Sequence, residues 1–229
     1  MIGIIGAMQK EVLDLRGQMT DTAEEKVGIS TIWQGRLYGQ DVALAQCGIG
    51  KVHAAMCALA LILAEKPQML INIGVAGALD ARLGIADCVI ASSAVQHDMD
   101  TSPIGDPVGM ISGINMVHLP CDPDMRRQLL IAAQKAGIRA LEGTIATGDR
   151  FIDRLEEKNS LRERFGALAC DMEGGAIAQA AYELGVPYAA TRCISDTLMG
   201  NGEEYAVNAD KAALASGRLL RHWLEALPR

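Results

Sequence analysis

Residues 2–19 of the chain, IGIIGAMQKEVLDLRGQM, join a short apolar run to a segment of mixed character. The run at residues 2–8 is typical of a buried strand, because it is short, rich in Ile and interrupted by Gly. The segment at residues 9–19 predicts an amphipathic helix that turns Val12, Leu13 and Leu15 inward. A buried strand followed at once by a helix is the repeating unit of α/β sheets, so this stretch predicts an α/β fold.

The rest of the sequence continues the alternation. Apolar runs predict further strands at residues 31–33, 42–47, 69–75, 88–95, 141–146, 167–172 and 188–195. Helical patterns cover residues 50–65, 122–137, 153–165, 174–184 and 207–227, whereas residues 98–118 are typical of a loop. The nearly all-apolar 50–65 helix is expected to be central. No linker divides the chain, so we predict one domain, residues 1–229, with a central mixed β-sheet sandwiched by helices.

Composition excludes several classes of partner. The net charge is −7 and only 3% of the residues are aromatic, whereas nucleic-acid binding needs basic surfaces and stacking rings. The longest apolar run, residues 54–64, is too short to span a membrane, which takes roughly 20 residues. The N-terminus has no basic segment of the kind that opens a signal peptide. Six cysteines without a CxxC pair are expected to be buried and reduced, so we predict a cytoplasmic protein.

Ligand sites in such sheets lie beyond the carboxyl ends of strands. Two glycine motifs at these positions differ from nucleotide-binding fingerprints. GIIG at residues 3–6 lacks the second glycine of GxGxxG, and GIGK at residues 48–51 is followed by Val52 instead of Ser or Thr. Enzymes of nicotinamide cofactors and nucleoside triphosphates are therefore disfavoured. Ordinary turns and close approach of the backbone to another ligand both remain open.

Carboxylates at strand ends are more informative. Glu11, Asp171, Glu173 and Asp196 each follow an apolar run, where an ionised group is costly to desolvate. Solvated first turns of helices would explain Glu11 and Glu173. Asp196 fits that explanation less well, because no clear helix follows it. Two carboxylates on one pocket are the arrangement that breaks a glycosidic bond, one protonating the leaving group and the other activating water.

The histidines suggest less. His97, Asp98 and Asp100 lie close together in sequence, but one imidazole and two carboxylates favour hydrogen bonds within a loop over a metal site. No histidine lies in a context typical of a nucleophilic Ser or Cys, so the sequence gives no support to covalent catalysis.

Seven short motifs occur together in an order typical of one family. They are GIIGAMQKEV (3–12), GIGKV (48–52), NIGVAG (72–77), QHDMD (96–100), TGDRFI (147–152), DME (171–173) and RCISD (192–196). On these motifs the chain resembles the nucleoside phosphorylase superfamily from about residue 2 to 224. Within it, the chain resembles the bacterial 5′-methylthioadenosine/S-adenosylhomocysteine nucleosidases. The resemblance implies a nucleoside phosphorylase-like fold, a homodimer, an adenine nucleoside as substrate, and N-ribosyl hydrolysis without metal or cofactor.

The resemblance also implies roles for residues at the reacting bond. Asp196, helped by Ser195, would protonate N7 of adenine and so improve the leaving group. Glu11 would act as the base on the attacking water, with Arg192 nearby to orient it.

Other positions would bind the substrate. Glu173 would accept hydrogen bonds from the ribose hydroxyls and Met172 would pack under the sugar. Phe151 would stack on adenine, although core packing is the alternative, and the Ile152 backbone would bind the edge of the base. The remaining positions that the family pattern assigns to the pocket are Met8, Ile49, Val75, Asp171 and Tyr205, with Thr101 and Ile104 supplied by the neighbouring subunit.

Departures from the family pattern concern substrate preference. Val75 stands where Ser or Thr is usual, Ile104 where an aromatic is usual, and Tyr205 in place of Phe. They leave an aminodeoxyfutalosine hydrolase open. A phosphate-dependent phosphorylase would need cations near the sugar, and Lys51 and Arg82 are the nearest candidates. A nucleoside-binding protein without catalytic activity is a third alternative.

Overall fold

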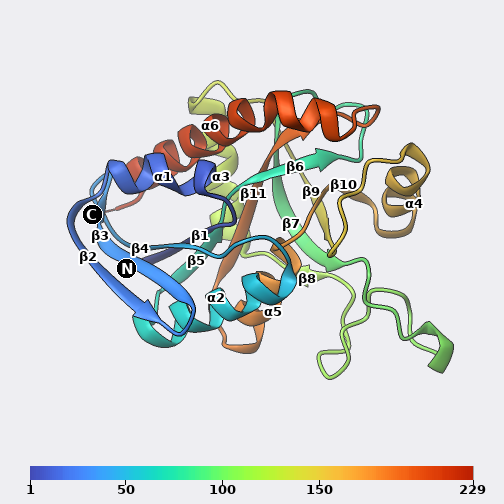
Figure 1. Ribbon diagram of the computed structural model, residues 1–229, viewed down its shortest axis with the longest axis horizontal. Coiled ribbons are helices and arrows are strands. Elements are labelled where there is room, and N and C mark those ends of the chain that lie inside the picture. Colours follow the sequence, from blue (N-terminus) through green and yellow to red (C-terminus); the bar gives the residue numbers. More distant parts are fainter. Residues whose placement is uncertain (229) are drawn as a thin grey trace.

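A twisted mixed sheet runs through the middle of the computed structural model, which describes residues 1–228 (Figure 1). Within those residues the sheet has eleven strands in the order β2-β3-β4-β1-β5-β11-β6-β10-β9-β7-β8. The strands are β1 (Ile2–Gly6), β2 (Thr20–Val27), β3 (Ser30–Leu37), β4 (Gln40–Gln46), β5 (Met69–Asn72), β6 (Val75–Ala78), β7 (Cys88–Gln96), β8 (Leu119–Pro120), β9 (Ala140–Thr147), β10 (Ala167–Asp171) and β11 (Tyr188–Asp196).

The last strand, β11, joins the two halves of the sheet. It pairs in parallel with β5 and β6 and antiparallel with β7, and every residue in it is buried. On one side β1 continues the parallel arrangement through β5. On the other side β10 runs antiparallel to β6 and parallel to β9. The sheet is therefore mixed, as the sequence predicted, and the ends of β10 and β11 do not lie along one common edge.

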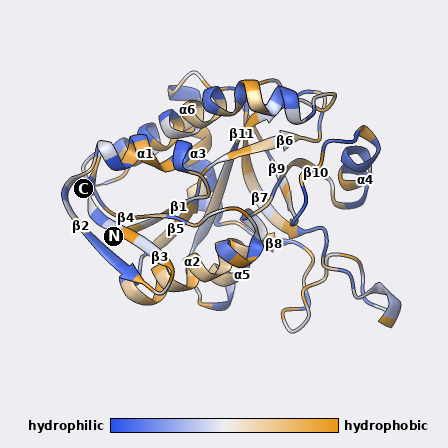
Figure 2. Cartoon of the chain, in the orientation of Figure 1, coloured by the Kyte–Doolittle hydropathy of each residue, from blue (hydrophilic) through white to orange (hydrophobic). Residues whose placement is uncertain are grey.

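Helices cover both faces (Figures 1 and 2). They are α1 (Gln9–Gly17), α2 (Lys51–Glu65), α3 (Pro123–Lys135), α4 (Leu155–Phe165), α5 (Gly174–Glu183) and α6 (Gly202–Ala226), with a 3₁₀ turn at Ser102–Ile104. One apolar core lies under α1, α3 and α6, and a second lies under α2 and α5. A smaller third core lies between α4 and the strands β9 and β10.

The strand β2 was missed by the sequence analysis. Its residues, TDTAEEKV, lack apolar alternation because nearly all of them are exposed, and the strand is hydrophilic in Figure 2. It is held by antiparallel pairing with β3, which extends the expected 31–33 strand to Ser30–Leu37. The expected 69–75 strand is divided into β5 and β6, which pair with different parts of β11.

Two predictions about helices were wrong. Leu13 of α1 is 54% exposed, so only Val12 and Leu15 of the expected trio are buried. The helix α2 is not enclosed, because a row of its apolar side chains faces outward: Val52, Met56, Leu59 and Leu63.

The last helix, α6, begins earlier than the expected residue 207. The side chain of Asn201 accepts hydrogen bonds from the backbone N–H groups of Glu203 and Glu204, which starts the helix at Gly202. The first turn of α6 therefore follows the end of β11 after only a short connection.

Across residues 1–228, no helix is both long and apolar enough to cross a membrane. All six cysteines fall within these residues, and they are buried and unpaired, as the sequence predicted.

Candidate active site

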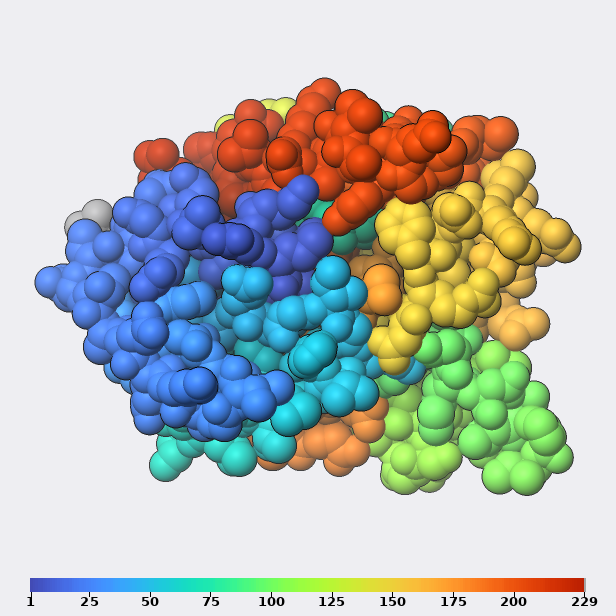
Figure 3. All heavy atoms as spheres, viewed as in Figure 1, coloured from blue at the N-terminus to red at the C-terminus, as the bar shows by residue number. Residues whose placement is uncertain are grey.

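A pocket of about 250 Å³ lies beside the central strand, where the turns after β1 and β5 meet the end of β10 and the start of α6. Segments from the first, middle and last parts of the chain frame a recess on the surface in Figure 3. Most of the residues that the sequence singled out line this pocket: Met8, Glu11, Ile49, Val75, Phe151, Ile152, Asp171, Met172, Glu173, Ser195, Asp196 and Tyr205. Three others, Arg192, Thr101 and Ile104, lie outside the lining.

Glu11 is held by backbone N–H groups. Its Oε2 accepts hydrogen bonds from Ala7 N at 2.7 Å and Met8 N at 2.8 Å, and its Oε1 accepts one from Val75 N at 3.1 Å. Burial raises the pKa of Glu11 above its usual value, and these bonds and the charge of Arg192 oppose the rise. The side chain joins the ends of β1 and β6, so a buried carboxyl group with a fixed orientation faces the pocket.

Asp196, the last residue of β11, has a partner on each oxygen. Its Oδ1 accepts a hydrogen bond from Ser195 Oγ at 2.9 Å, and its Oδ2 lies 3.0 Å from Lys158 Nζ. Both Asp196 and Lys158 are buried. Lys158 was not predicted as a site residue, because it lies in a charged helix that was expected to face solvent. Its spacing from the apolar Leu161 and Phe165, three and seven residues on, was the available signal that it shares their buried face.

Glu173 also lines the pocket and lies at the N-terminus of α5. Its Oε1 accepts a hydrogen bond from Gly50 N at 3.0 Å. Burial and the nearby negative charge of Asp171 raise the pKa of Glu173 to about 7, while Arg192 and the bond from Gly50 act in the opposite direction.

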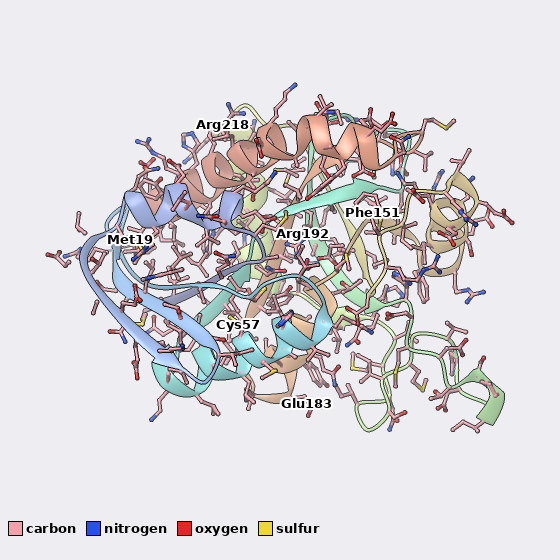
Figure 4. The ribbon with its side chains drawn as sticks, in the orientation of Figure 1. Met19, Cys57, Phe151, Glu183, Arg192 and Arg218 are labelled. Carbon is pink, nitrogen blue, oxygen red and sulfur yellow. The ribbon has the colours of Figure 1, made fainter. Side chains whose placement is uncertain are left out.

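Asp171 and Arg192 form a buried ion pair, with 2.6 Å between Asp171 Oδ2 and Arg192 Nη2. The guanidinium also donates to the backbone and side-chain oxygens of Asn72. Figure 4 shows Arg192 in the middle of the molecule. Asp171 is the last residue of β10 and Arg192 lies in the middle of β11. The ion pair therefore holds the end of β10 beside the middle of β11. Arg192 does not line the pocket itself. It acts there through its ion pair with Asp171, which does line the pocket, and through its positive charge, which opposes the rise in the pKa of Glu11.

Aromatic side chains border the pocket on the side of α4. The rings of Phe151 and Tyr205 lie 5.4 Å apart and meet edge to face, and Phe151 is 46% exposed. The Tyr205 hydroxyl lies 3.3 Å from Met8 Sδ. The pocket therefore offers an apolar surface to a flat ring.

The loop at residues 98–118 projects from the body of the molecule (Figure 1). Thr101 Oγ1 donates to Asp106, and Ile104 is 81% exposed. Asp98 pairs with Lys51 at 2.5 Å, and Asp100 accepts a hydrogen bond from Ser102 N at 2.9 Å. These bonds agree with the loop interpretation of both aspartates.

Comparison with known proteins gives the class of the chain. A sequence model of the phosphorylase superfamily matches residues 1–225. Among relatives, the chain is 35% identical over 218 residues to the 5′-methylthioadenosine/S-adenosylhomocysteine nucleosidase of Staphylococcus haemolyticus. The matched region covers 93% of this chain and 95% of the relative.

Solved structures agree. The 5′-methylthioadenosine/S-adenosylhomocysteine nucleosidase of Colwellia psychrerythraea 34H, in complex with adenine, is similar with a TM-score of 0.92 at 33% identity, covering 97% of this chain and 93% of that one. Futalosine hydrolase of Helicobacter pylori strain 26695 gives a TM-score of 0.93 at 30% identity, covering 99% and 97%. The chain belongs to the phosphorylase superfamily and, within it, to the family of 5′-methylthioadenosine/S-adenosylhomocysteine nucleosidases. This confirms the family and the fold that the sequence predicted.

Proposed function

We propose that the protein hydrolyses the N-glycosidic bond of 5′-methylthioadenosine and S-adenosylhomocysteine and releases adenine. The observation that carries this proposal is the pair of buried carboxyl groups, Glu11 and Asp196, on one pocket that also offers an aromatic wall and a third carboxyl group. Acid and base groups on one pocket are what cleavage of a glycosidic bond requires.

Asp196 acts at the base. A protonated carboxyl group there transfers its proton to N7 of adenine, and the electron pair of the bond between C1′ and N9 leaves with the purine. Ser195 holds one oxygen of the carboxyl group. Phe151 stacks on the purine ring, and the Ile152 backbone binds its edge.

Glu11 acts at the sugar. It accepts a proton from water as the water oxygen attacks C1′ of the oxocarbenium-like ribosyl group, which gives the free sugar. Three backbone N–H groups hold its carboxylate in one orientation, which supports this role because a fixed base loses little entropy in the step. Glu173 accepts hydrogen bonds from the ribose hydroxyls, and Met172 packs under the sugar.

The decisive experiment measures free adenine from a panel of adenine nucleosides, with and without phosphate. We expect release from both thioethers without phosphate. Asp196→Asn and Glu11→Gln are expected to keep nucleoside binding and to lose at least a hundredfold in kcat. Binding of nucleosides without release of adenine by the wild-type protein would instead support a non-catalytic binding protein.

The positions of Lys51 and Arg82, the two candidate ligands for phosphate, disfavour a phosphorylase. Lys51 is paired with Asp98, and Arg82 is paired with Asp80 at 2.9 Å. Neither lines the pocket. Adenine release that depends on phosphate would overturn this assignment.

Aminodeoxyfutalosine hydrolysis is the second candidate activity, because the futalosine hydrolase of Helicobacter pylori has nearly the same fold. The pocket differs from the usual family pattern at Val75 and Tyr205, which both line it. Including aminodeoxyfutalosine in the substrate panel separates the two activities by kcat/KM.

We also propose a cytoplasmic homodimer. Six buried, unpaired cysteines suit a reducing compartment. The outward apolar row on α2, and Ile104 at the tip of an extended loop, are surfaces that a second copy would cover. In this arrangement, Thr101 and Ile104 of one copy complete the 5′ side of the other copy's pocket.

A further inference from the structure

Lys158 is a buried cation beside the carboxyl group to which the proposed function assigns leaving-group protonation. It lies on α4 with its side chain fully buried. Its Nζ donates to Asp196 Oδ2 at 3.0 Å, to Thr197 O at 2.9 Å and to Gly200 O at 3.0 Å. These bonds use all three N–H groups of the ammonium, so both the cation and the carboxylate are held in one place.

This burial sets Lys158 apart from its helix. The other charged residues of α4 are exposed or partly exposed, whereas Lys158 lies on the face of Leu161 and Phe165. Burying an ammonium is costly unless a partner compensates it, and an apolar side chain would satisfy the packing of α4 without that cost. A lysine kept inside, with its charge directed at Asp196, therefore points to a role at that carboxyl group.

On the basis of the proposed function, we propose that Lys158 is a positioning residue that orients the Asp196 carboxyl group and, through its charge, sets the upper pH limit of adenine release. Lys158 is not among the residues that line the pocket, so it acts through Asp196. An adjacent ammonium favours the ionised carboxylate. A neutral side chain in place of Lys158 would remove this preference, so the upper pH limit of adenine release should change when the ammonium is removed.

The other titratable groups around Asp196 do not compete for this role. Cys170 on β10 faces it, and burial raises the pKa of this thiol to about 12. Tyr205 on α6 has a phenol whose pKa is raised, again mainly by burial. Both stay neutral in the working range.

Glu173 also lines the pocket, and its pKa of about 7 lies inside the working range. The charges that act on it are those of Asp171, Arg192 and Glu11, so its titration should not move when Lys158 is replaced. Glu11, which also lines the pocket, must be ionised to act as a base and so governs the acidic limb of the activity profile.

The kinetic test compares the pH dependence of kcat for the wild type, Lys158→Met, Lys158→Gln and Lys158→Arg. Activity at high pH fails when the general acid loses its proton. We expect the alkaline limb to move to higher pH by about 1–3 units in the Met and Gln variants. The Arg variant, which keeps the charge, should retain the wild-type limb, and the acidic limb should not move. Arg162→Met is the matched control, because it removes a half-exposed cation of the same helix that faces Asp80. The alkaline limb of its kcat profile should match that of the wild type.

A second measurement needs no catalysis. In protein labelled with ¹³C at aspartate carboxyl carbons, the signal that Asp196→Asn removes is followed against pH by NMR. We expect this signal to titrate at higher pH in Lys158→Gln than in the wild type. Unmoved titration and an unmoved alkaline limb in both neutral variants would overturn the proposal. Absence of adenine release by the wild type would overturn the proposed function instead, and the NMR titration would still decide whether Lys158 controls Asp196.

Discussion

At the scale of single residues, two glycines make room for the proposed acid and base. A Cβ atom on Gly74 would lie 2.7 Å from Glu11 Oε1, and one on Gly77 would lie 2.8 Å from Asp196 Oδ2. Both distances are shorter than a carbon and an oxygen tolerate. The carboxyl groups therefore occupy the space that ordinary side chains would take, which ties these glycines to the site and not to a turn alone.

Gly77→Ala should therefore displace the general acid. The backbone at Gly77 does not have a positive φ, so alanine is tolerated there and the clash falls on Asp196 and on Cys170 Sγ, 3.3 Å away. We expect kcat for adenine release to fall at least tenfold, with a Tm change of only a few degrees. Gly217→Ala is the matched control, because its Cβ meets nothing closer than 4.0 Å and alanine favours helix. Unchanged kcat in Gly77→Ala would show that the position of Asp196 does not limit the reaction.

Glu173 should make stability depend on pH. Its pKa is raised in the folded protein to about 7 from 4.5, so the unfolded chain releases this proton first as pH rises. The contribution of Glu173 to folding is therefore fully present below pH 4.5 and is lost as pH rises to about 7. Glu173→Gln has no charge to desolvate. We expect it to exceed the wild type in free energy of unfolding by on the order of 1–3 kcal/mol at pH 8, and by little at pH 4.5.

Urea unfolding at the two pH values measures this difference. Glu163→Gln, at an exposed position on α4, is the control and should show no such trend. A Glu173→Gln variant less stable than the wild type at pH 8 would contradict a raised pKa for Glu173.

At the scale of elements, the start of α6 connects stability to the pocket. Asn201 caps the helix, and Tyr205, which lines the pocket, lies in its first turn. Asn201→Ala should cost about 1 kcal/mol, measured as a lower Tm, and should raise KM because the Tyr205 ring is less firmly held. Asn208→Ala removes an amide from the body of the same helix and should do neither. A fall in Tm without a change in KM would separate the cap from the pocket.

The sequence predicted most elements because most carry their own apolar pattern. It failed where an element is stabilised by its neighbours. β2 has no buried face and depends on pairing with β3, and the first turn of α6 depends on one amide cap. The carboxylates after strands were found because strand ends are visible in the pattern. Lys158 was not predicted because its helix is charged overall, although its spacing from Leu161 and Phe165 places it on their buried face.

At the scale of the whole molecule, the pocket lies where the two halves of the sheet meet. Glu11 follows the first strand, Asp196 ends the last strand, and Glu173 follows β10, which runs antiparallel to its neighbour β6. No single sheet edge brings these three together. The long strand β11, which pairs with β5, β6 and β7, supplies the common support, and the ion pair between Asp171 and Arg192 links β10 to it.

The same pocket reaches the surface that we assign to a second copy. Gly50, which donates to Glu173, is the residue before α2, and Ile49 lines the pocket while 55% exposed. The outward apolar row on α2 begins directly after them. A neighbouring chain that covered this row would also support the turn that holds Glu173, so association and substrate binding should be linked.

An acidic side chain introduced into this apolar row should therefore dissociate the dimer and weaken substrate binding. We expect the wild type to sediment as a dimer in analytical ultracentrifugation and Leu63→Asp, at a side chain 60% exposed, to sediment as a folded monomer with a raised KM. A buried unpaired carboxylate costs several kcal/mol, which is enough to dissociate an interface at micromolar concentration. Leu214→Asp, 68% exposed on α6 in the opposite layer, is the matched control and should remain a dimer. A monomeric wild type, or a Leu63→Asp variant that stays dimeric, would place the contact surface elsewhere and remove the reason for linking it to Glu173.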